Sequence, residues 1–241
     1  MKTINLSGNV IPDEYATMYD WFGMPAISPQ GVNTQLKEAN GDDVTINLSS
    51  NGGDVFSGSQ IYTALKSYSG NVNINVTGLA ASAASVIAMA GDNLQMSPTA
   101  QLMIHKAWSN VAGNADDHDH ESQVLDKIDN SIVNAYVAKT GMDRADIMKM
   151  MSSETWMTAK EAVDKGFADG IMFADETVPV FTNSLGGLPS KASVNKFLNM
   201  MNKQAEAEQS NQPENDNKKN EKPTPSLRDQ KLAILLGKDD E

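Results

Sequence analysis

The residues of this chain that could do covalent chemistry begin with Ser82. It follows Gly78–Ala81 and opens an alanine-rich segment, at a point where a strand is expected to turn into a helix. A hydroxyl at such a turn lies near a helix N-terminus, which stabilises a developing negative charge. Small residues are also common wherever two elements pack tightly. Ser82 taken alone therefore indicates either a nucleophile or close packing.

A glycine pair, Gly52 and Gly53, follows an earlier predicted strand. Glycine adopts backbone conformations closed to other residues and can leave its N–H group exposed. Gly53 and the residue after the serine, Ala83, could therefore supply the two N–H groups of an oxyanion hole. The alternative is a simple tight turn. Phosphate binding fits less well, because the motif lacks the lysine of a P-loop.

His105 is the one histidine of three that stands at the end of an apolar strand, where a side chain is held rigidly. That position suits a general base, although a histidine there can equally be a hydrogen-bonded core residue. His118 and His120 lie in an acidic segment, but residues two apart on a helix face different ways and cannot chelate one ion. A solvated helix start is the better interpretation, and we expect neither a metal nor a cofactor.

Two stretches show the period-two alternation of half-buried strands, Val44–Leu48 and Val72–Val76. The residues between them, from Gly52 to Gly70, have helical spacing, so the two strands should be parallel and joined by a helical crossover. The next elements expected are a helix at about Ala81–Ala90 and strands at Leu94–Met96 and Leu102–His105. This order is typical of an α/β fold.

Long helical periodicity follows from about Asp116 to Thr140, and Gly141 can end this helix in a left-handed cap. A second helix is expected at Arg144–Met151. Thr158 and Glu161 form the capping box of a further helix, which ends near Gly166 and leads to a last strand at Ile171–Phe173.

The composition changes beyond about residue 180. We expect one α/β domain over 1–180, a linker with a short amphipathic helix over 181–209, and a disordered linker over 210–226, where Asn, Lys, Glu, Pro and Gln dominate. Residues 227–241 should form a short helix or docking segment.

The net charge of -12 argues against binding to nucleic acid or to an anionic membrane. Without cysteine there is no disulfide, thiolate zinc site or cysteine nucleophile. No apolar run reaches the roughly 18 residues of a membrane span, and no signal-peptide core follows the start. We therefore expect a soluble, cytoplasmic protein.

Taken together, these motifs resemble the ClpP peptidase family, and more closely its phage-encoded branch of head maturation (prohead) proteases. The resemblance covers about Thr3 to Phe173 and rests on four motifs in the family's order: Gly52-Gly53, Gly78-Leu79-Ala80-Ala81-Ser82, Met103-Ile104-His105 and Glu154-Thr155-Trp156-Met157-Thr158-Ala159-Lys160-Glu161-Ala162.

The resemblance implies a mechanism for a serine endopeptidase. Ser82 would attack the peptide carbonyl, His105 would take its proton and Glu154 would orient the imidazole. The amides of Gly53 and Ala83 would hold the oxyanion. Two positions depart from the family pattern, with Glu154 where most ClpP proteins carry aspartate and Asn51 where they carry proline.

The resemblance also implies fold and partners. Gly52 would line the bound substrate, and the fold would be crotonase-like, with repeated ββα units and the helix at 116–140 as a handle between stacked homo-oligomeric rings. Substrates would be capsid or scaffold proteins, or the chain's own tail, cleaved in the prohead inside a bacterial host. Since the first strand begins at about Thr3, the segment with which ClpP contacts its ATPase should be missing, so we expect no Clp ATPase partner.

Three other functions stay open. The first is a crotonase-like acyl-transfer or acyl-CoA enzyme, which shares the fold and an oxyanion hole but needs no Ser-His pair. The second is a catalytically silent capsid assembly component. The third is a serine-lysine dyad using Lys106, which leaves His105 unexplained.

Overall fold

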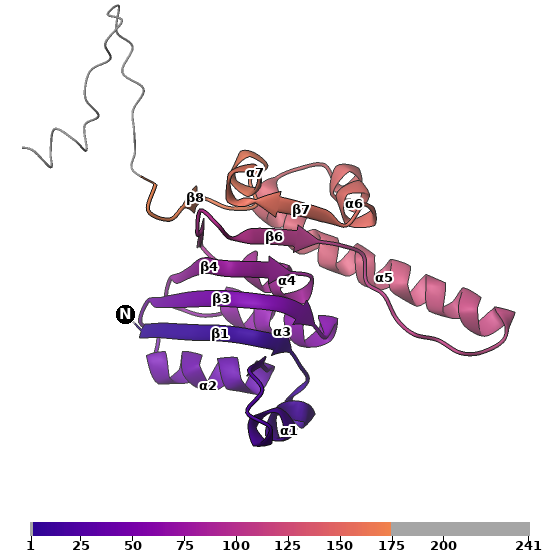
Figure 1. The fold of residues 1–241 in the computed structure, drawn as a ribbon, viewed down its shortest axis with the longest axis horizontal. Coiled ribbons are helices and arrows are strands. Elements are labelled where there is room, and N and C mark those ends of the chain that lie inside the picture. Colours follow the sequence, from indigo (N-terminus) through magenta and orange to yellow (C-terminus); the bar gives the residue numbers. More distant parts are fainter. Residues whose placement is uncertain (1, 175–241) are drawn as a thin grey trace, which may run out of the picture. The chain divides into compact units, whose positions relative to one another are not determined.

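The fold is built on one sheet of eight strands in the computed structural model, which describes residues 2–174. The strand order is β2-β1-β3-β4-β5-β8, and β6 pairs with both β4 and β7 (Figure 1). All pairs are parallel except β6 with β7. The strands are β1 (Lys2–Val10), β2 (Ala26–Ile27), β3 (Val44–Gly53), β4 (Val72–Ala81), β5 (Asn93–Met96), β6 (Gln101–Ile104), β7 (Thr155–Thr158) and β8 (Gly170–Ile171).

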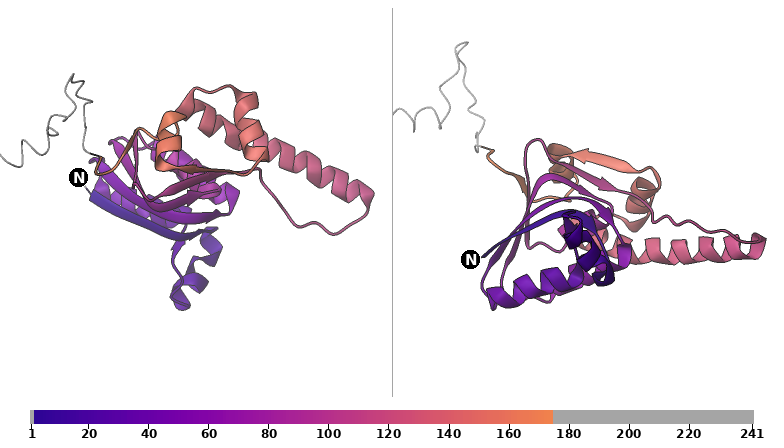
Figure 2. Two further views of the ribbon diagram at one scale, coloured as in Figure 1. Left: turned by 45° about the horizontal axis from the view of Figure 1, so that its top comes forward. Right: turned by 60° about the horizontal axis from the view of Figure 1, so that its bottom comes forward.

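Helices connect the parallel strands. Helix α4 contacts α3 and the strands β3 and β4, and α2 contacts α3, so these three helices cover the same face of the sheet. The right-hand view in Figure 2 shows the first strands arching over them. The helical elements are η1 (Asp13–Tyr15), α1 (Ala16–Trp21), α2 (Pro29–Ala39), α3 (Val55–Lys66), α4 (Ala83–Ala88), α5 (Ala115–Thr140), α6 (Arg144–Ser152) and α7 (Ala159–Asp164).

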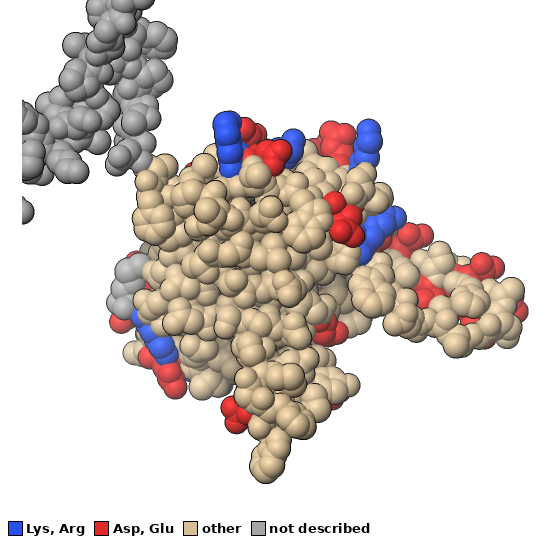
Figure 3. All heavy atoms as spheres, in the orientation of Figure 1, with Lys and Arg blue, Asp and Glu red and all other residues tan. Residues whose placement is uncertain are grey.

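Helix α5 is the longest helix described, and its first half projects away from the sheet (Figures 1 and 2). Asn114 and Asp117 form a capping box at its start, which satisfies N–H groups that have no partner inside the helix. Acidic side chains lie along the projecting part in Figure 3, and its buried residues begin only at Asp129. The second half is fixed to the domain, where Lys139 Nζ lies 2.6 Å from Asp169 Oδ2. The buried contacts of this helix therefore lie in its second half.

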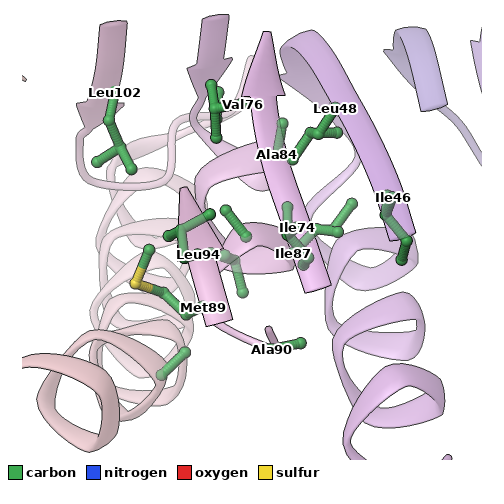
Figure 4. Packing of buried hydrophobic residues seen from close by; sticks show 14 of the residues in the cluster. Ile46, Leu48, Ile74, Val76, Ala84, Ile87, Met89, Ala90, Leu94 and Leu102 are labelled. Atoms are coloured by element: carbon green, nitrogen blue, oxygen red, sulfur yellow. The ribbon is translucent and has the colours of Figure 1, made fainter. Parts of the chain in front are cut away.

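The core lies between the sheet and the covering helices. Alternate residues of β3 and β4, among them Ile46, Leu48, Ile74 and Val76, point into it, and Ile87 of α4 belongs to the same buried cluster (Figure 4). The other face of the sheet is polar, with asparagine amides hydrogen-bonded across the strands. This division explains the period-two alternation in the sequence, because burial of the apolar side chains stabilises one face only.

The predicted α/β fold class is confirmed, and so are the parallel pair β3–β4 and its helical crossover. The Gly141 cap is also confirmed, at φ 68°. Three boundaries were wrong: α4 covers only Ala83–Ala88, β6 ends at Ile104, one residue before His105, and β8 ends at Ile171 rather than Phe173. Apolar residues continue past the ends of α4 and β8, so composition alone does not mark where their backbone hydrogen bonding stops.

The sequence did not predict η1, α1, β2, α2 or β7. Strand β7 has only four residues and depends on pairing with β6 rather than on its own pattern. The segments predicted over 181–209, 210–226 and 227–241 lie outside the described residues, as does the end of the predicted domain. Among the helices of residues 2–174, none is long and apolar enough to cross a bilayer.

Replacing Gly8 by alanine should destabilise the domain more than replacing Gly23. Both have positive φ, 93° and 63°, so both substitutions strain the backbone. A Cβ at Gly8 would lie 1.9 Å from the carbonyl oxygen of Pro25, whereas a Cβ at Gly23 would meet nothing within 4 Å. In urea unfolding we expect Gly23→Ala to cost about 1 kcal/mol and Gly8→Ala at least about 3 kcal/mol. Equal costs would contradict the close approach of β1 to the Pro25 segment.

Candidate active site

The turn at Ser82 joins β4 to α4 and brings the serine to the histidine. Ser82 has φ 56° and ψ -126°, a backbone conformation with positive φ that a non-glycine residue rarely adopts. Its N–H donates to the carbonyl of Met103 in β6, at 3.0 Å. Since His105 directly follows β6, this bond ties the two segments together. Ser82 Oγ and His105 Nε2 lie 2.7 Å apart, at hydrogen-bond distance.

The glycine pair lies beside this turn. Gly52 has φ 94°, and a Cβ there would lie 2.6 Å from the Ala81 oxygen and 2.7 Å from the Ser82 Cβ. The missing side chain therefore lets the end of β3 approach the Ser82 turn. Gly53 is exposed, with φ 147°, and a Cβ there would lie 2.1 Å from the Val10 oxygen. Only glycine fits at either position without movement of the backbone.

Ala83 is the first residue of α4. The first N–H groups of a helix have no carbonyl partner within it, so they are free to bind an anion. The Ala83 N–H follows directly after the Ser82 carbonyl, next to the hydroxyl that contacts His105. Its place in the chain is the one expected of an oxyanion donor.

His105 is partly buried, and hydrogen bonds hold the residues that follow it. The Lys106 N–H donates to the Met151 carbonyl at 3.2 Å, and the Ala107 N–H donates to Asp129 Oδ1 at 2.8 Å. Asp129 lies in α5 and is 1% exposed. Its carboxylate therefore fixes the segment after the histidine to the long helix.

The pairing of β6 with β7 places Glu154 opposite His105, but the Glu154 side chain is hydrogen-bonded to another residue. Strand β6 pairs antiparallel with β7, with Ile104 opposite Thr155, so the next pair outward would be His105 and Glu154. Glu154 has φ 46° and is exposed. The Trp156 Nε1–H donates to Glu154 Oε1 at 3.2 Å. No hydrogen bond joins Glu154 to His105 in the structure of residues 2–174.

A cavity of about 320 Å³ opens beside Ser82 and His105. Its lining is mostly apolar and comes from α3, α4, α5 and the segment after His105. The apolar lining residues are Val55, Phe56, Ala83, Val86, Ala107, Trp108, Val124, Leu125, Ile128 and Ile132. A neighbouring hollow of about 250 Å³ shares the walls of α3 and α5. Space for a side chain of a bound molecule therefore exists next to the hydroxyl.

The structure also bears on the other predicted residues. Lys106 Nζ lies 3.6 Å from Asp129 Oδ2 and 4.0 Å from Asp126 Oδ1, and it is not among the residues that line the Ser82 cavity. This disfavours a serine-lysine dyad. His118 and His120 are exposed on α5, and no cluster that could hold a metal ion occurs among residues 2–174.

Comparison with known proteins identifies the family. The model of the Clp protease family matches residues 33–175. The chain belongs to the Clp protease family. It is 35% identical over 138 residues to ATP-dependent Clp protease proteolytic subunit 1 of Chlamydia abortus, covering 56% of this chain and 72% of that protein. It is 30% identical over 134 residues to ATP-dependent Clp protease proteolytic subunit of Bacteroides fragilis, covering 55% and 65%.

This membership of the Clp protease family makes the chain a peptidase. The matched region includes every residue that the motifs predicted for the site, from Gly52 to Glu154. Three further buried polar residues near it were not predicted: Ser85, Asp129 and Tyr136. Ser85 and Asp129 are polar residues within apolar helical periodicity, which is the signal that marks them, but the sequence does not reveal their partners.

Asp129→Ala should lower the free energy of unfolding by about 2 kcal/mol or more, because the Ala107 N–H then loses its acceptor inside the protein. Asp129→Asn keeps an acceptor oxygen and should cost less. Asp126→Ala is the matched control, since Asp126 is exposed and, like Asp129, lies near Lys106, with 4.0 Å between Lys106 Nζ and Asp126 Oδ1. This variant should change the free energy of unfolding by less than about 0.5 kcal/mol. Urea unfolding measures all three. A similar cost for Asp126→Ala and Asp129→Ala would contradict a role for the buried carboxylate.

Proposed function

We propose that this chain is a serine endopeptidase of the ClpP type, with Ser82 as nucleophile and His105 as general base. The observation that carries the proposal is the 2.7 Å distance between Ser82 Oγ and His105 Nε2 at a strand-to-helix turn. An isolated serine hydroxyl is a weak nucleophile, and a base at hydrogen-bond distance activates it. An acyl-CoA enzyme or a silent assembly component would not require this pair.

The proposed reaction has two halves. Ser82 Oγ bonds to the carbonyl carbon of the substrate while its proton passes to His105 Nε2. The N–H groups of Gly53 and Ala83 bind the resulting oxyanion. Gly52 contributes to substrate binding by letting the end of β3 lie close to the Ser82 turn. His105 then gives the proton to the leaving amine, and the C–N bond breaks. Water, deprotonated by the same imidazole, cleaves the acyl-enzyme and regenerates the Ser82 hydroxyl.

Glu154 is the proposed acid that orients the imidazole. The β6–β7 register supports this role, because its continuation sets Glu154 opposite His105. To accept a hydrogen bond from His105 Nδ1, the carboxylate has to turn away from the Trp156 indole. Catalytic hydrogen bonds are often long or poorly aligned without substrate and tighten when it binds, so the contact between Glu154 and Trp156 in the free protein is compatible with this role.

The proposed substrates are phage capsid or scaffold proteins, or the chain's own tail, cleaved within the prohead in the host cytoplasm by homo-oligomeric rings. The sequence resemblance to the head maturation branch supports this assignment. We further propose that cleavage needs no ATPase. Hydrolysis of a peptide bond requires no nucleotide, and the proposed nucleophile, base and oxyanion donors all come from this one chain.

A fluorophosphonate probe, which reacts with activated serines, should label wild-type protein at Ser82 without any ATPase. Ser82→Ala and His105→Ala should lose both labelling and peptide hydrolysis, because no attack is possible without the hydroxyl or its base. Glu154→Gln should lower kcat by at least about 100-fold, whereas Glu154→Asp keeps a carboxylate and should retain more activity. Mass spectrometry locates the label and circular dichroism confirms folding. Activity comparable to that of the wild type in all four variants would reject the triad.

The substrate assignment predicts cleavage of capsid or scaffold protein when proheads are assembled from their purified proteins in the presence of active enzyme and without ATP. The control is the same mixture with Ser82→Ala enzyme. Fragments seen by mass spectrometry only with active enzyme support the assignment. The assignment would be refuted if the enzyme cleaved short peptides but left the capsid and scaffold proteins uncleaved, even when an unfoldase and ATP are present.

A further inference from the structure

Two buried hydroxyl groups beneath the nucleophile turn have no part in the mechanism described so far. Ser85 and Tyr136 are both 0% exposed. Ser85 Oγ lies 2.6 Å from the Ser82 carbonyl oxygen and 2.8 Å from the Tyr136 hydroxyl. The three residues thus form a chain of hydrogen bonds that runs from α5 to the backbone of the serine.

The direction of this chain follows from its end. A carbonyl oxygen can only accept, so the Ser85 hydroxyl donates to Ser82, and its oxygen is left to accept from Tyr136. Burial raises the pKa of the Tyr136 phenol well above its ordinary value, so the group stays protonated and remains a donor. The Tyr136 ring packs against Phe167, with centroids 6.0 Å apart, which fixes the position of the hydroxyl.

The carbonyl of Ser82 and the N–H of Ala83 belong to one peptide unit. In a planar trans peptide these two groups point in opposite directions, so a contact that holds the carbonyl also aims the N–H. The Ser82 carbonyl accepts from the backbone N–H groups of Ser85 at 2.9 Å and Val86 at 3.3 Å as well. The Ser85 hydroxyl adds a third and shorter bond, at a residue whose positive φ strains the backbone.

We infer that Tyr136 and Ser85 are positioning residues, which aim the Ala83 N–H at the substrate oxyanion by holding the Ser82 carbonyl. This inference rests on the proposed serine peptidase function. Oxyanion donors act because their orientation is fixed before the reaction. A small rotation of the Ser82–Ala83 peptide therefore reduces stabilisation of the transition state more than it reduces substrate binding. Tyr136 also lines the cavity beside Ser82, but among residues 2–174 its hydroxyl is hydrogen-bonded to Ser85 alone. Removing both hydroxyls should therefore cost no more than removing that of Ser85.

The experiment compares Ser85→Ala, Tyr136→Phe and the double variant in full-length protein, using a fluorogenic peptide that the wild type cleaves. We expect kcat to fall about tenfold or more for Ser85→Ala and less for Tyr136→Phe, with KM within twofold, because complete loss of an oxyanion donor costs about 100-fold or more. The double variant should match Ser85→Ala. A peptide aldehyde, which forms a tetrahedral adduct with serine, should bind more weakly by the same factor as kcat.

Tyr68→Phe is the matched control. It also removes a hydrogen-bonded phenol hydroxyl, because the Tyr68 hydroxyl donates to the Asp42 carbonyl at 2.7 Å. Tyr68 precedes the start of β4, whereas Ser82 follows its end. We expect this variant to lose stability without a change in kcat. A Ser85→Ala protein that stays folded with wild-type kcat and aldehyde affinity would overturn the inference. Absence of labelling at Ser82 in the wild type would instead reject the proposed function, and this inference with it.

Discussion

The backbone conformation of Ser82 is the constraint on which the rest of the site depends. A positive φ outside the left-handed helical region costs a residue with a side chain about 1–3 kcal/mol, and it persists only where the surroundings enforce it. Here a bond to β6 holds the N–H, α4 and Ser85 hold the carbonyl, and Gly52 packs against the Cβ. These contacts leave the hydroxyl of Ser82 free to face His105 rather than the core.

The parallel strands make this arrangement possible. The carboxyl ends of strands β3, β4 and β6 lie on the same side of the sheet, and one part of the site follows each of them. β3 ends in the glycine pair, β4 leads into Ser82, and β6 leads into His105. Because the core below is packed from alternate residues of the same strands, the relative positions of these ends are fixed by burial of apolar surface (Figure 4).

Much of this could be predicted from the sequence, because strand alternation and chain order determine which segments meet at an edge. The parallel direction of the strands that begin at Val44 and Val72, and the order of the Gly52, Ser82 and His105 motifs, were accessible in this way. The pairing partner of Thr155 was not, since β7 is too short to show a pattern of its own. The contacts of Asp129 and Tyr136 were hidden as well. Each is one residue on a helix, and the group that it bonds is a backbone atom or a hydroxyl far away in the chain.

Buried polar residues of helix α5 contact both the Ser82 turn and the segment after His105. Asp129 holds the segment after His105, and Tyr136, two turns later on the same helix, holds Ser85 under the Ser82 turn. Two residues that are seven apart lie on the same face of a helix, so one face of α5 contacts both segments. A buried carboxylate and a buried phenol each cost desolvation that only a well-formed partner offsets. Any shift of α5 along its axis would leave one of them unsatisfied, and the distance between Ser82 and His105 is therefore tied to the position of this helix.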